Sequence, residues 1–572
     1  MTETFALTAL ALAALAVGAP AARRRWQLSR AKHRSLAGHA RLAKRVAALV
    51  PGYAYDEARF YCADGAPETV AAQRRAALAR LSALLRERAP RTLALTAQAR
   101  AGLADLQFTS RYRMPFQFSP LVREALPVGA FVQASEGVQV EDLDGNRYYD
   151  LTGSYGVNLL GYDVYKDCIA EGAQRVAALG PVLGALHPCV ADNIARLRAL
   201  SGLDEVSFHM SGTEAVMQAA RLARYHTGRK YLVRFAGAYH GWWEDVQPGP
   251  GNPLPPRETY TLRDMAEASL AVLRTRRDIA CVLFNPLQAL HPNVAAPGDS
   301  SLVAARTAGG FDRAAYSAWL RRLRAVCSER GIVLIFDEVF VGFRLAPGGA
   351  QEYFGVRADV VVYGKTLGGG LPVGVVCGCA ELMRRFRDDR PADICFARGT
   401  FNAHPYVMGA MQVFLERLDS PAVRALYDGL DARWNARAQQ LNDALAAAGV
   451  PVRVANLSSI FTVRYIEPSR YHWLSQYYLR AQGLALAWIG TGRLIFSLNY
   501  TDEDFAQVAQ RFVAAACAMQ ADGWWWRDAR LTRAAIGRQL AREMAAQWWQ
   551  RAVGRPAPEA GAPTLAEYAR LR

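Results

Sequence analysis

The feature that most constrains the fold is a series of five short apolar segments separated by stretches with helical spacing, such as Ala314–Glu329. Apolar runs of this length are typical of strands that are buried on both faces, as in a parallel sheet covered by helices. The last three runs are almost continuously apolar and the first two are less pure. The five predicted strands are Val206–Met210, Tyr231–Phe235, Ile279–Phe284, Ile332–Phe336 and Val360–Tyr363.

A chemically capable residue follows each of these strands. In chain order they are Ser211-Gly212-Thr213, Tyr239-His240-Gly241, Asn285, Asp337 and Gly364-Lys365. In open α/β sheets, ligands bind beyond the carboxyl ends of the strands. We therefore expect these residues to surround one crevice.

The turn Ser211-Gly212-Thr213 precedes a helix that has Glu214 in its first turn and Gly228 just beyond its end. The N-terminus of such a helix presents free backbone N–H groups, which suit a phosphate. A plain helix cap explains this motif equally well when it is taken alone.

Asp337 ends an apolar strand and is followed by Glu338. A carboxylate in this place can keep a ring nitrogen protonated through a charge-assisted hydrogen bond, and a protonated ring acts as an electron sink. Capping the strand or binding a metal are the alternatives, and the residue alone does not decide between them.

Lys365 lies among glycines, in Gly364-Lys365-Thr366-Leu367-Gly368-Gly369-Gly370, directly after a buried strand. Desolvation disfavours an ammonium, so we expect a nucleophilic amine. A phosphate-binding loop of the Walker type is excluded, because there the lysine follows the glycines.

The order of the motifs resembles that of class III aminotransferases, and most closely that of glutamate-1-semialdehyde aminomutases and related aminotransferase domains. The resemblance covers roughly residues 115–513. It rests on Ser211-Gly212-Thr213-Glu214-Ala215-Val216, Tyr239-His240-Gly241, Asp337-Glu338-Val339, Gly342-Phe343-Arg344, Gly364-Lys365 and Gly399-Thr400. It implies an enzyme of PLP fold type I that uses pyridoxal 5′-phosphate (PLP).

The resemblance also implies roles for individual residues. Lys365 would carry PLP as a Schiff base and then move the proton during catalysis, and Asp337 would pair with the ring nitrogen. Tyr239 and Val339 would lie on opposite faces of the ring, with His240 beside it. Thr400 would reach the phosphate of a neighbouring subunit, which makes a homodimer the expected unit. The residues implied at the phosphate are Ser211, Gly212 and Thr213.

Three positions depart from the family pattern. Asn285-Pro286 stands where family members place Glu before Pro, and this leaves the identity of the amino donor undecided. His404 replaces an Asn after Gly399-Thr400. The entrance motif Asn-Ser-Pro-Val-Arg of aminomutases is missing, and Phe118 to Arg123 has a different lead-in. An aminotransferase is therefore favoured over a mutase.

Composition and motif spacing also bear on nucleic-acid partners, disulfides and metal sites. The formal net charge of +17 would attract anions, but the sequence has no zinc-finger spacing, RNP-like stretch or basic leucine zipper, so we expect no nucleic-acid partner. Nine scattered cysteines predict a reducing compartment, and Cys377 and Cys379 are interpreted as part of a buried strand. His187, His209 and His291 lack ligand-like spacing, so no metal site is expected. Arg344 and Arg398 are candidates for a substrate carboxylate or for ion pairs with Asp337 and Glu338.

Both ends of the chain raise the question of a membrane. The apolar run from Phe5 to Ala22 precedes Arg23-Arg24-Arg25, which predicts a cytoplasmic location for the rest. The run is equally consistent with a membrane anchor and with a helix that docks on the protein. Trp524-Trp525-Trp526 and Trp548-Trp549 lie among arginines, as at a membrane interface, although packing against the N-terminal extension is favoured slightly.

We expect an α/β fold with a mostly parallel central sheet, a smaller α+β domain and an added N-terminal helical extension. The predicted function is a cytoplasmic PLP-dependent aminotransferase that transfers an amino group from a small donor to an aldehyde or ketone. If both ends of the chain bind lipid, the enzyme would contact the cytoplasmic face of the membrane, and the acceptor would be lipophilic or carrier-bound. An aminomutase and a non-catalytic membrane-docking scaffold are the alternatives. The predicted domains are 1–27 (apolar segment), 28–112 (helical extension), 113–165 (first part of the small domain), 166–400 (PLP domain), 401–516 (second part of the small domain) and 517–572 (Trp/Arg-rich tail).

Overall fold

The computed structural model describes residues 18–32, 45, 48–247, 258–263, 265–286, 312–486 and 493–553. The chain divides into two compact units. Unit 1 comprises Met1–Lys44, Val164–Val294 and Asp312–Asp428, and unit 2 comprises Arg45–Asp163, Ala295–Phe311 and Gly429–Arg572. Unit 1 therefore continues past residue 400, where the sequence placed the end of the PLP domain.

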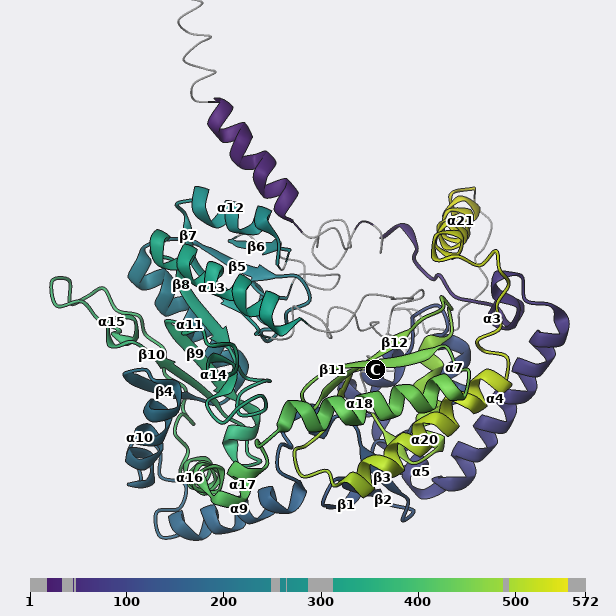
Figure 1. The fold of residues 1–572 in the computed structure, drawn as a ribbon, viewed down its shortest axis with the longest axis horizontal. Coiled ribbons are helices and arrows are strands. Elements are labelled where there is room, and N and C mark those ends of the chain that lie inside the picture. Colours follow the sequence, from purple (N-terminus) through teal and green to yellow (C-terminus); the bar gives the residue numbers. More distant parts are fainter. Residues whose placement is uncertain are drawn as a thin grey trace, which may run out of the picture. The chain divides into compact units, whose positions relative to one another are not determined.

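Unit 1 contains a seven-stranded sheet in the order β4-β10-β9-β8-β7-β5-β6 (Figure 1). Its strands are β4 (Glu205–His209), β5 (Tyr231–Phe235), β6 (Thr259–Leu262), β7 (Ile279–Phe284), β8 (Val333–Asp337), β9 (Val360–Gly364) and β10 (Gly374–Gly378). Only β10 runs antiparallel to its neighbours. The five predicted strands are all present within one residue of their expected ends, and the expected α/β fold with a mostly parallel sheet is confirmed.

Helices cover both faces of this sheet, which explains the continuous apolar runs. On one face, α11 (Gly212–Thr227) packs Ala215 and Ala219 into a cluster with Val333 and Ile335 of β8. On the other face, Trp319 of α13 contacts the rings of Phe235 and Phe284. The helices of unit 1 are α9 (Tyr162–Val176), α10 (Cys189–Ser201), α11, α12 (Glu267–Thr275), α13 (Arg313–Arg330), α14 (Gly349–Phe354), η3 (Lys365–Gly368), α15 (Ala380–Met383), α16 (Pro405–Asp419) and α17 (Pro421–Ala425).

An N-terminal helix over residues 18–31 lies at the β6 edge of the sheet. Lys32 forms an antiparallel bridge with Leu262, and the Arg263 N–H donates to the Ala31 carbonyl at 2.9 Å. Residues 5–17 of the predicted apolar run lie outside the described residues. Where the structure describes the chain, none of the helices has both the length and the apolar character that crossing a bilayer requires.

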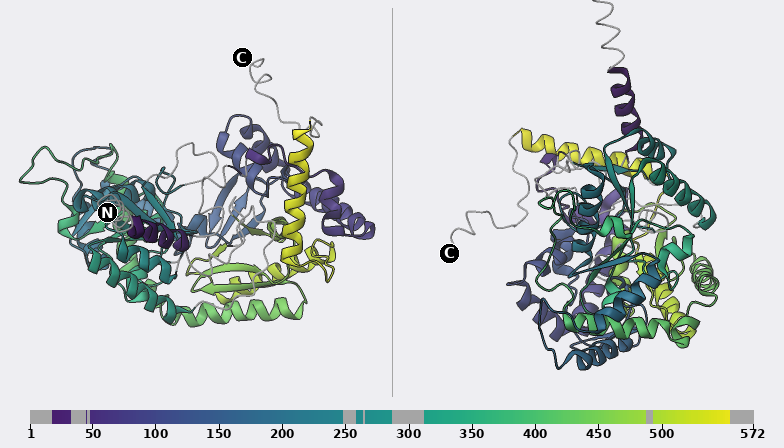
Figure 2. Two further views of the ribbon diagram at one scale, coloured as in Figure 1. Left: turned by 90° about the horizontal axis from the view of Figure 1, so that it is seen from above. Right: turned by 90° about the vertical axis from the view of Figure 1, so that its left-hand side faces the viewer.

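Unit 2 contains two smaller sheets, with strand orders β1-β2-β3-β13 and β11-β12-β14. The strands β2 and β3 form a hairpin around the Asp144-Gly145 turn. Figures 1 and 2 show α18 lying along β11 and β12, and the Asn442 side chain bonds both the N–H and the carbonyl of Val454. The strands are β1 (Val132–Glu136), β2 (Gln139–Asp142), β3 (Arg147–Asp150), β11 (Val452–Leu457), β12 (Ile460–Tyr465), β13 (Leu484–Ala485) and β14 (Arg493–Ile495).

Within residues 48–112, the predicted helical extension supplies α3, α4, α5 and α6 to unit 2. The longest of them, α4, buries Ala77, Leu78 and Leu81 along one side. The helices of unit 2 are α3 (Glu57–Cys62), η2 (Ala63–Gly65), α4 (Glu68–Arg88), α5 (Pro90–Arg100), α6 (Ala104–Tyr112), α7 (Ser119–Ala125), α8 (Gly153–Gly156), α18 (Leu430–Ala447), η4 (His472–Leu474), α19 (Ser475–Ala481), α20 (Asp502–Ala521) and α21 (Arg533–Ala552).

The tryptophan-rich segment has two different environments. Trp524 is 1% exposed, and its ring lies 5.9 Å from that of Phe60 in the extension. Arg74 of α4 stacks on the same indole and donates to the Gly523 carbonyl at 2.9 Å. The favoured interpretation, packing against the extension, therefore holds for Trp524. Trp548 and Trp549 of α21, in contrast, are 48% and 63% exposed.

A buried charge network joins three segments of unit 2 that are far apart in the sequence. Arg470 is 1% exposed and bonds Asp64 of η2 at 2.6 Å and Glu543 of α21 at 2.8 Å. The Tyr55 hydroxyl accepts a further bond from Arg470 at 2.7 Å. This arrangement pairs the buried guanidinium with two carboxylates and attaches both the extension and α21 to the same core.

Replacing Arg470 should destabilise unit 2 strongly. Arg470→Met leaves two largely buried carboxylates without their cation, a change that typically costs about 3–5 kcal/mol. Urea unfolding followed by tryptophan fluorescence should show this loss. Arg80→Met is the matched control, because the Arg80–Asp522 pair is at the surface and should cost at most about 1 kcal/mol. Equal effects of the two substitutions would contradict a supporting role for the buried network.

Candidate active site

The predicted site residues of unit 1 lie at one edge of the large sheet. Asp337 ends β8 and is paired in register with Val362 of the parallel strand β9, so Lys365 lies three residues further along that neighbouring strand. Gly374 of β10 is opposite both Gly364 and His209, the last residues of β9 and β4. The ends of β4, β9, β8, β7 and β5 therefore meet at the carboxyl edge, as the sequence predicted.

Asp337 and His240 form the electrostatic centre of this edge. The Asp337 carboxylate is 3% exposed, and its Oδ2 lies 2.7 Å from His240 Nδ1. Its Oδ1 accepts from the Val339 N–H at 3.1 Å. Burial lowers the pKa of His240, although the hydrogen bond with Asp337 acts in the opposite direction. A carboxylate held in this way still has lone pairs for one more donor.

Asn285 braces the same edge, a role that the sequence did not reveal. Its Oδ1 accepts from the Tyr239 N–H at 3.0 Å, and its Nδ2 donates to the Asp337 carbonyl at 3.2 Å. The amide thus connects the ends of β5 and β8. Tyr239 is 52% exposed, and partial burial, together with the charge of Asp337, raises the pKa of its hydroxyl.

The N-terminus of α11 has the features of an anion site. The Ser211 hydroxyl caps the Glu214 N–H at 3.3 Å, and the Glu214 carboxylate in turn accepts from the Met210 N–H at 3.0 Å. The N–H groups of Gly212 and Thr213 are in the first turn, so they have no acceptor within the helix. A sixteen-residue helix also places partial positive charge there.

Two glycines bring the neighbouring groups close to this helix end. A Cβ on Gly212 would lie 2.9 Å from Val339 Cγ1, so only glycine fits against that valine. Gly241 has a φ of +87°, and a Cβ there would lie 2.5 Å from the Thr213 hydroxyl oxygen. Because Gly212 and Gly241 have no side chains, Val339 can approach Gly212 closely and Thr213 can approach Gly241 closely. Both side chains therefore lie beside the N-terminus of α11.

Lys365 has an unusual backbone conformation. It follows the extended residue Gly364 and opens η3 with a φ of +48°, which is strained for a residue with a side chain. Its Nζ lies 5.8 Å from the centre of the Phe340 ring. Gly364 is required next to it, because a Cβ there would lie 3.0 Å from the Val373 carbonyl oxygen.

The two carboxylates proposed as ion-pair partners of Arg344 and Arg398 are engaged elsewhere. Glu338 accepts from the N–H groups of Ala350 and Gln351 at 2.7 and 3.2 Å, and burial raises its pKa to about 8. Asp337 is bonded to His240. Arg344 is 1% exposed, and burial lowers its pKa to about 10, whereas Arg398 is exposed.

The remaining candidates fall outside this centre. Thr400 lies in an exposed turn of unit 1. His187 accepts from the Cys189 N–H, and His209 contacts the Ser207 hydroxyl, while His291 lies outside the described residues. Within the ranges that the structure describes, no three or more His, Cys, Asp or Glu side chains are grouped as a metal site.

The residues at the sheet edge fit PLP. The N-terminus of α11 could hold a phosphate, the braced Asp337 carboxylate could accept from a pyridine N–H, and Lys365 supplies an amine. The glycines at 212 and 241 let Val339 and Thr213 lie close to this helix end, beside the proposed phosphate site.

Comparison with known proteins identifies the family. The class III aminotransferase model matches residues 122–244 and 282–516. A glutamate-1-semialdehyde 2,1-aminomutase of Nitratidesulfovibrio vulgaris is 32% identical over 394 residues, covering 66% of this chain and 89% of that protein. The aminomutase of Desulfotalea psychrophila is 34% identical over 361 residues, covering 60% and 78% of the two chains.

Solved structures give the same family. A transaminase with PLP bound is 27% identical, with a TM-score of 0.56, and covers 69% of this chain and 92% of its own. An ω-transaminase of Sphaerobacter thermophilus is 25% identical, with a TM-score of 0.56, and covers 73% and 97% of the two chains. The chain therefore belongs to the class III aminotransferase family and is a PLP-dependent enzyme.

Proposed function

We propose that this enzyme transfers an amino group from a small amino donor to an aldehyde or ketone, with PLP held at the carboxyl edge of the unit 1 sheet. The observation that carries the proposal is the placement of Lys365 directly beyond β9, next to β8, which ends in the Asp337–His240 pair. An amine and a buried acid at neighbouring strand ends are the two groups that this cofactor chemistry needs.

Asp337 and His240 are assigned to the cofactor ring. Bound PLP supplies an electron sink for the reacting carbon. Asp337 accepts a hydrogen bond from the ring N–H and so keeps that nitrogen charged. His240 holds the carboxylate in place from behind, since its donor nitrogen is occupied and its ring is buried.

The other assigned residues bind and orient the cofactor. Ser211, Gly212 and Thr213 receive the phosphate at the N-terminus of α11. Val339, fixed against Gly212, lies on one face of the ring, and Tyr239, whose side chain is half exposed, lies on the other. Lys365 binds the cofactor through Nζ and afterwards moves a proton to and from the substrate carbon.

The identity of the donor depends on a position that differs from the family pattern. Both ends of the Asn285 amide are engaged, with the Tyr239 N–H and the Asp337 carbonyl. Asn285 therefore acts as a brace and carries no charge to select a donor. An intramolecular aminomutase remains the second candidate, because the curated relatives described above carry that name.

Amination of an aldehyde should require an added amino donor and Lys365. With PLP-loaded protein, omission of the donor should stop product formation, whereas donor-free conversion of an amino aldehyde would favour the mutase. Lys365→Ala should lower turnover by at least about 10²–10⁴-fold and remove the absorbance band of lysine-bound PLP. Lys230→Ala, on an exposed lysine, is the control and should match wild type. Retention of both the band and turnover in Lys365→Ala would refute the assignment.

We also propose that the enzyme is a homodimer. Unit 1 exposes several large apolar side chains that a partner subunit could cover. They are Leu186 (64%), Trp242 (72%), Phe386 (51%), Ile394 (55%), Phe396 (67%) and Phe401 (49%). Thr400 is adjacent to Phe401, which supports its assignment to the phosphate of the partner subunit.

A charge in this apolar set should weaken the dimer. Phe396→Glu introduces a carboxylate that a buried interface does not accept without a partner. Light scattering after gel filtration should show a shift from the mass of two 62.7 kDa chains toward that of one, together with weaker PLP retention. Val132→Glu, at a residue of unit 2 that is 60% exposed, controls for added charge. A monomeric wild-type protein that keeps PLP would exclude the proposal.

Contact with the cytoplasmic face of a membrane is proposed from α21. This helix buries only Ile536, and it exposes Trp548 and Trp549 beside arginines. An aromatic and basic helix of this kind binds at the surface of anionic bilayers. The arginines at 23–25, directly after the apolar N-terminal run, support the same orientation.

Flotation with vesicles tests the membrane contact. Full-length protein should float with vesicles that contain phosphatidylserine, and less with pure phosphatidylcholine. The double variant Trp548→Ala/Trp549→Ala should lower the floated fraction severalfold, because it removes both exposed indoles without touching the core. Recovery of all wild-type protein in the lipid-free fraction would rule the contact out.

A further inference from the structure

The residue that follows Lys365 is bonded to a helix from a distant part of the sequence. Pairing of β9 with β10 ends at Gly364, so the strand ladder does not include Lys365 itself. Thr366 is 5% exposed, and its hydroxyl is hydrogen-bonded to the hydroxyl of Tyr165, which lies in α9. This bond joins the segment that carries the proposed PLP lysine to another element of unit 1.

The Tyr165 ring is fixed by aromatic neighbours. It is 5% exposed and stacks on the Phe414 ring of α16, with 6.2 Å between the ring centres and 18° between the ring planes. Phe414 in turn contacts Phe343, whose ring stacks on Tyr363 of β9 at 5.3 Å. The core of unit 1 therefore holds the ring, and with it the position of the Tyr165 hydroxyl beside η3.

The glycines after Lys365 let the same segment lie directly against α9 and α16. A Cβ on Gly370 would lie 3.1 Å from Ile169 Cδ1 and 3.4 Å from Tyr165 Cβ, both in α9. Gly369 has a φ of +59°, and a Cβ there would lie 2.5 Å from the Ala410 carbonyl oxygen of α16. The segment that contains Lys365 is thus packed on the two helices that hold the Tyr165 ring.

We propose that Tyr165 is a positioning residue for Lys365: its hydroxyl holds Thr366, and Thr366 fixes the backbone from which the Lys365 side chain projects. The inference rests on the proposed role of Lys365 in binding PLP. The φ of +48° at Lys365 is a conformation that persists only where the surroundings enforce it. Without the hydroxyl bond the backbone can relax and displace the amine, and a displacement of about 1 Å can slow a reaction about 10²-fold.

Two substitutions remove the bond from its opposite ends. Tyr165→Phe keeps the ring stack on Phe414, and Thr366→Val keeps the shape of the threonine. Full-length protein freed of cofactor is mixed with saturating PLP in a stopped-flow instrument, and the rise of the lysine-bound absorbance band is followed. Each variant should form the band at least about tenfold more slowly than wild type. The double variant should be no slower than either single variant, because both remove the same bond.

Thr366→Ser is the conservative variant, since it retains the hydroxyl, and it should form the band at a rate within about twofold of wild type. Tyr225→Phe is the matched control. It removes a tyrosine hydroxyl bond of 2.6 Å, to the Asp393 carbonyl of unit 1, which does not involve the lysine segment, and it should leave the rate unchanged. A purely structural bond would lower the thermal stability of Tyr165→Phe and Thr366→Val without slowing the band.

The results separate this inference from the proposed function. Wild-type rates in Tyr165→Phe and Thr366→Val, or a double variant slowed by the product of the two single effects, would overturn the positioning role while the assignment of Lys365 stands. Absence of the band in wild-type protein would instead refute the assignment of Lys365 to PLP, and the positioning role with it.

Discussion

The hydrogen bond between the Asp337 carboxylate and His240 Nδ1 is the interaction on which the site depends. Both side chains are almost completely buried, and His240 and the Val339 N–H bond the two oxygens of the carboxylate. Asn285 fixes the backbone on both sides of the pair. The carboxylate is thus held in one orientation at the edge of the sheet.

The parallel register of the sheet turns this local arrangement into a catalytic one. With Asp337 paired to Val362, the chain has three residues in which to leave β9 and present Lys365. Gly364 and the positive φ of Lys365 make that exit sharp. The strain is tolerated because β8 and β10 flank β9 on both sides. Lys365, with its positive φ, therefore directly follows a strand that is paired on both sides.

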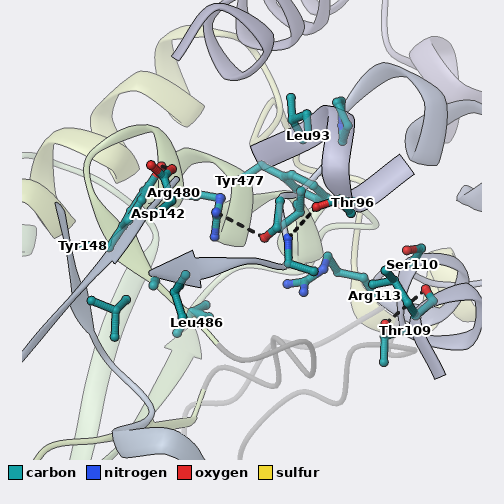
Figure 3. A pocket seen from close by; sticks show the side chains of 18 of the residues that line it. Leu93, Thr96, Thr109, Ser110, Arg113, Asp142, Tyr148, Tyr477, Arg480 and Leu486 are labelled. Atoms are coloured by element: carbon teal, nitrogen blue, oxygen red, sulfur yellow. Dashed lines mark hydrogen bonds between the residues drawn. The ribbon is translucent and has the colours of Figure 1, made fainter. Parts of the chain in front are cut away.

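The helical extension before residue 122 and the tail after residue 516 are the parts of unit 2 that the family model does not match. The Arg470 network and Trp524 attach the extension and the C-terminal tail to the small-domain core. The same extension lines a cavity of unit 2 with a volume of about 450 Å³ (Figure 3).

The sequence alone determined the five buried strands and the order of reactive residues after them, because parallel strands buried on both faces need continuous apolar runs and place their ends at one edge. It could not predict β6, a four-residue strand at the end of the sheet with polar Thr259 and Thr261, since so short a segment has no periodic signal. The tertiary structure alone decided what partners the buried polar groups have. His240 bonds Asp337 across 97 positions, Asn285 connects Tyr239 with Asp337, and Arg470 joins residues 64 and 543. Such contacts arise from the packing of distant segments, and neither periodicity nor spacing along one chain records which segments will meet.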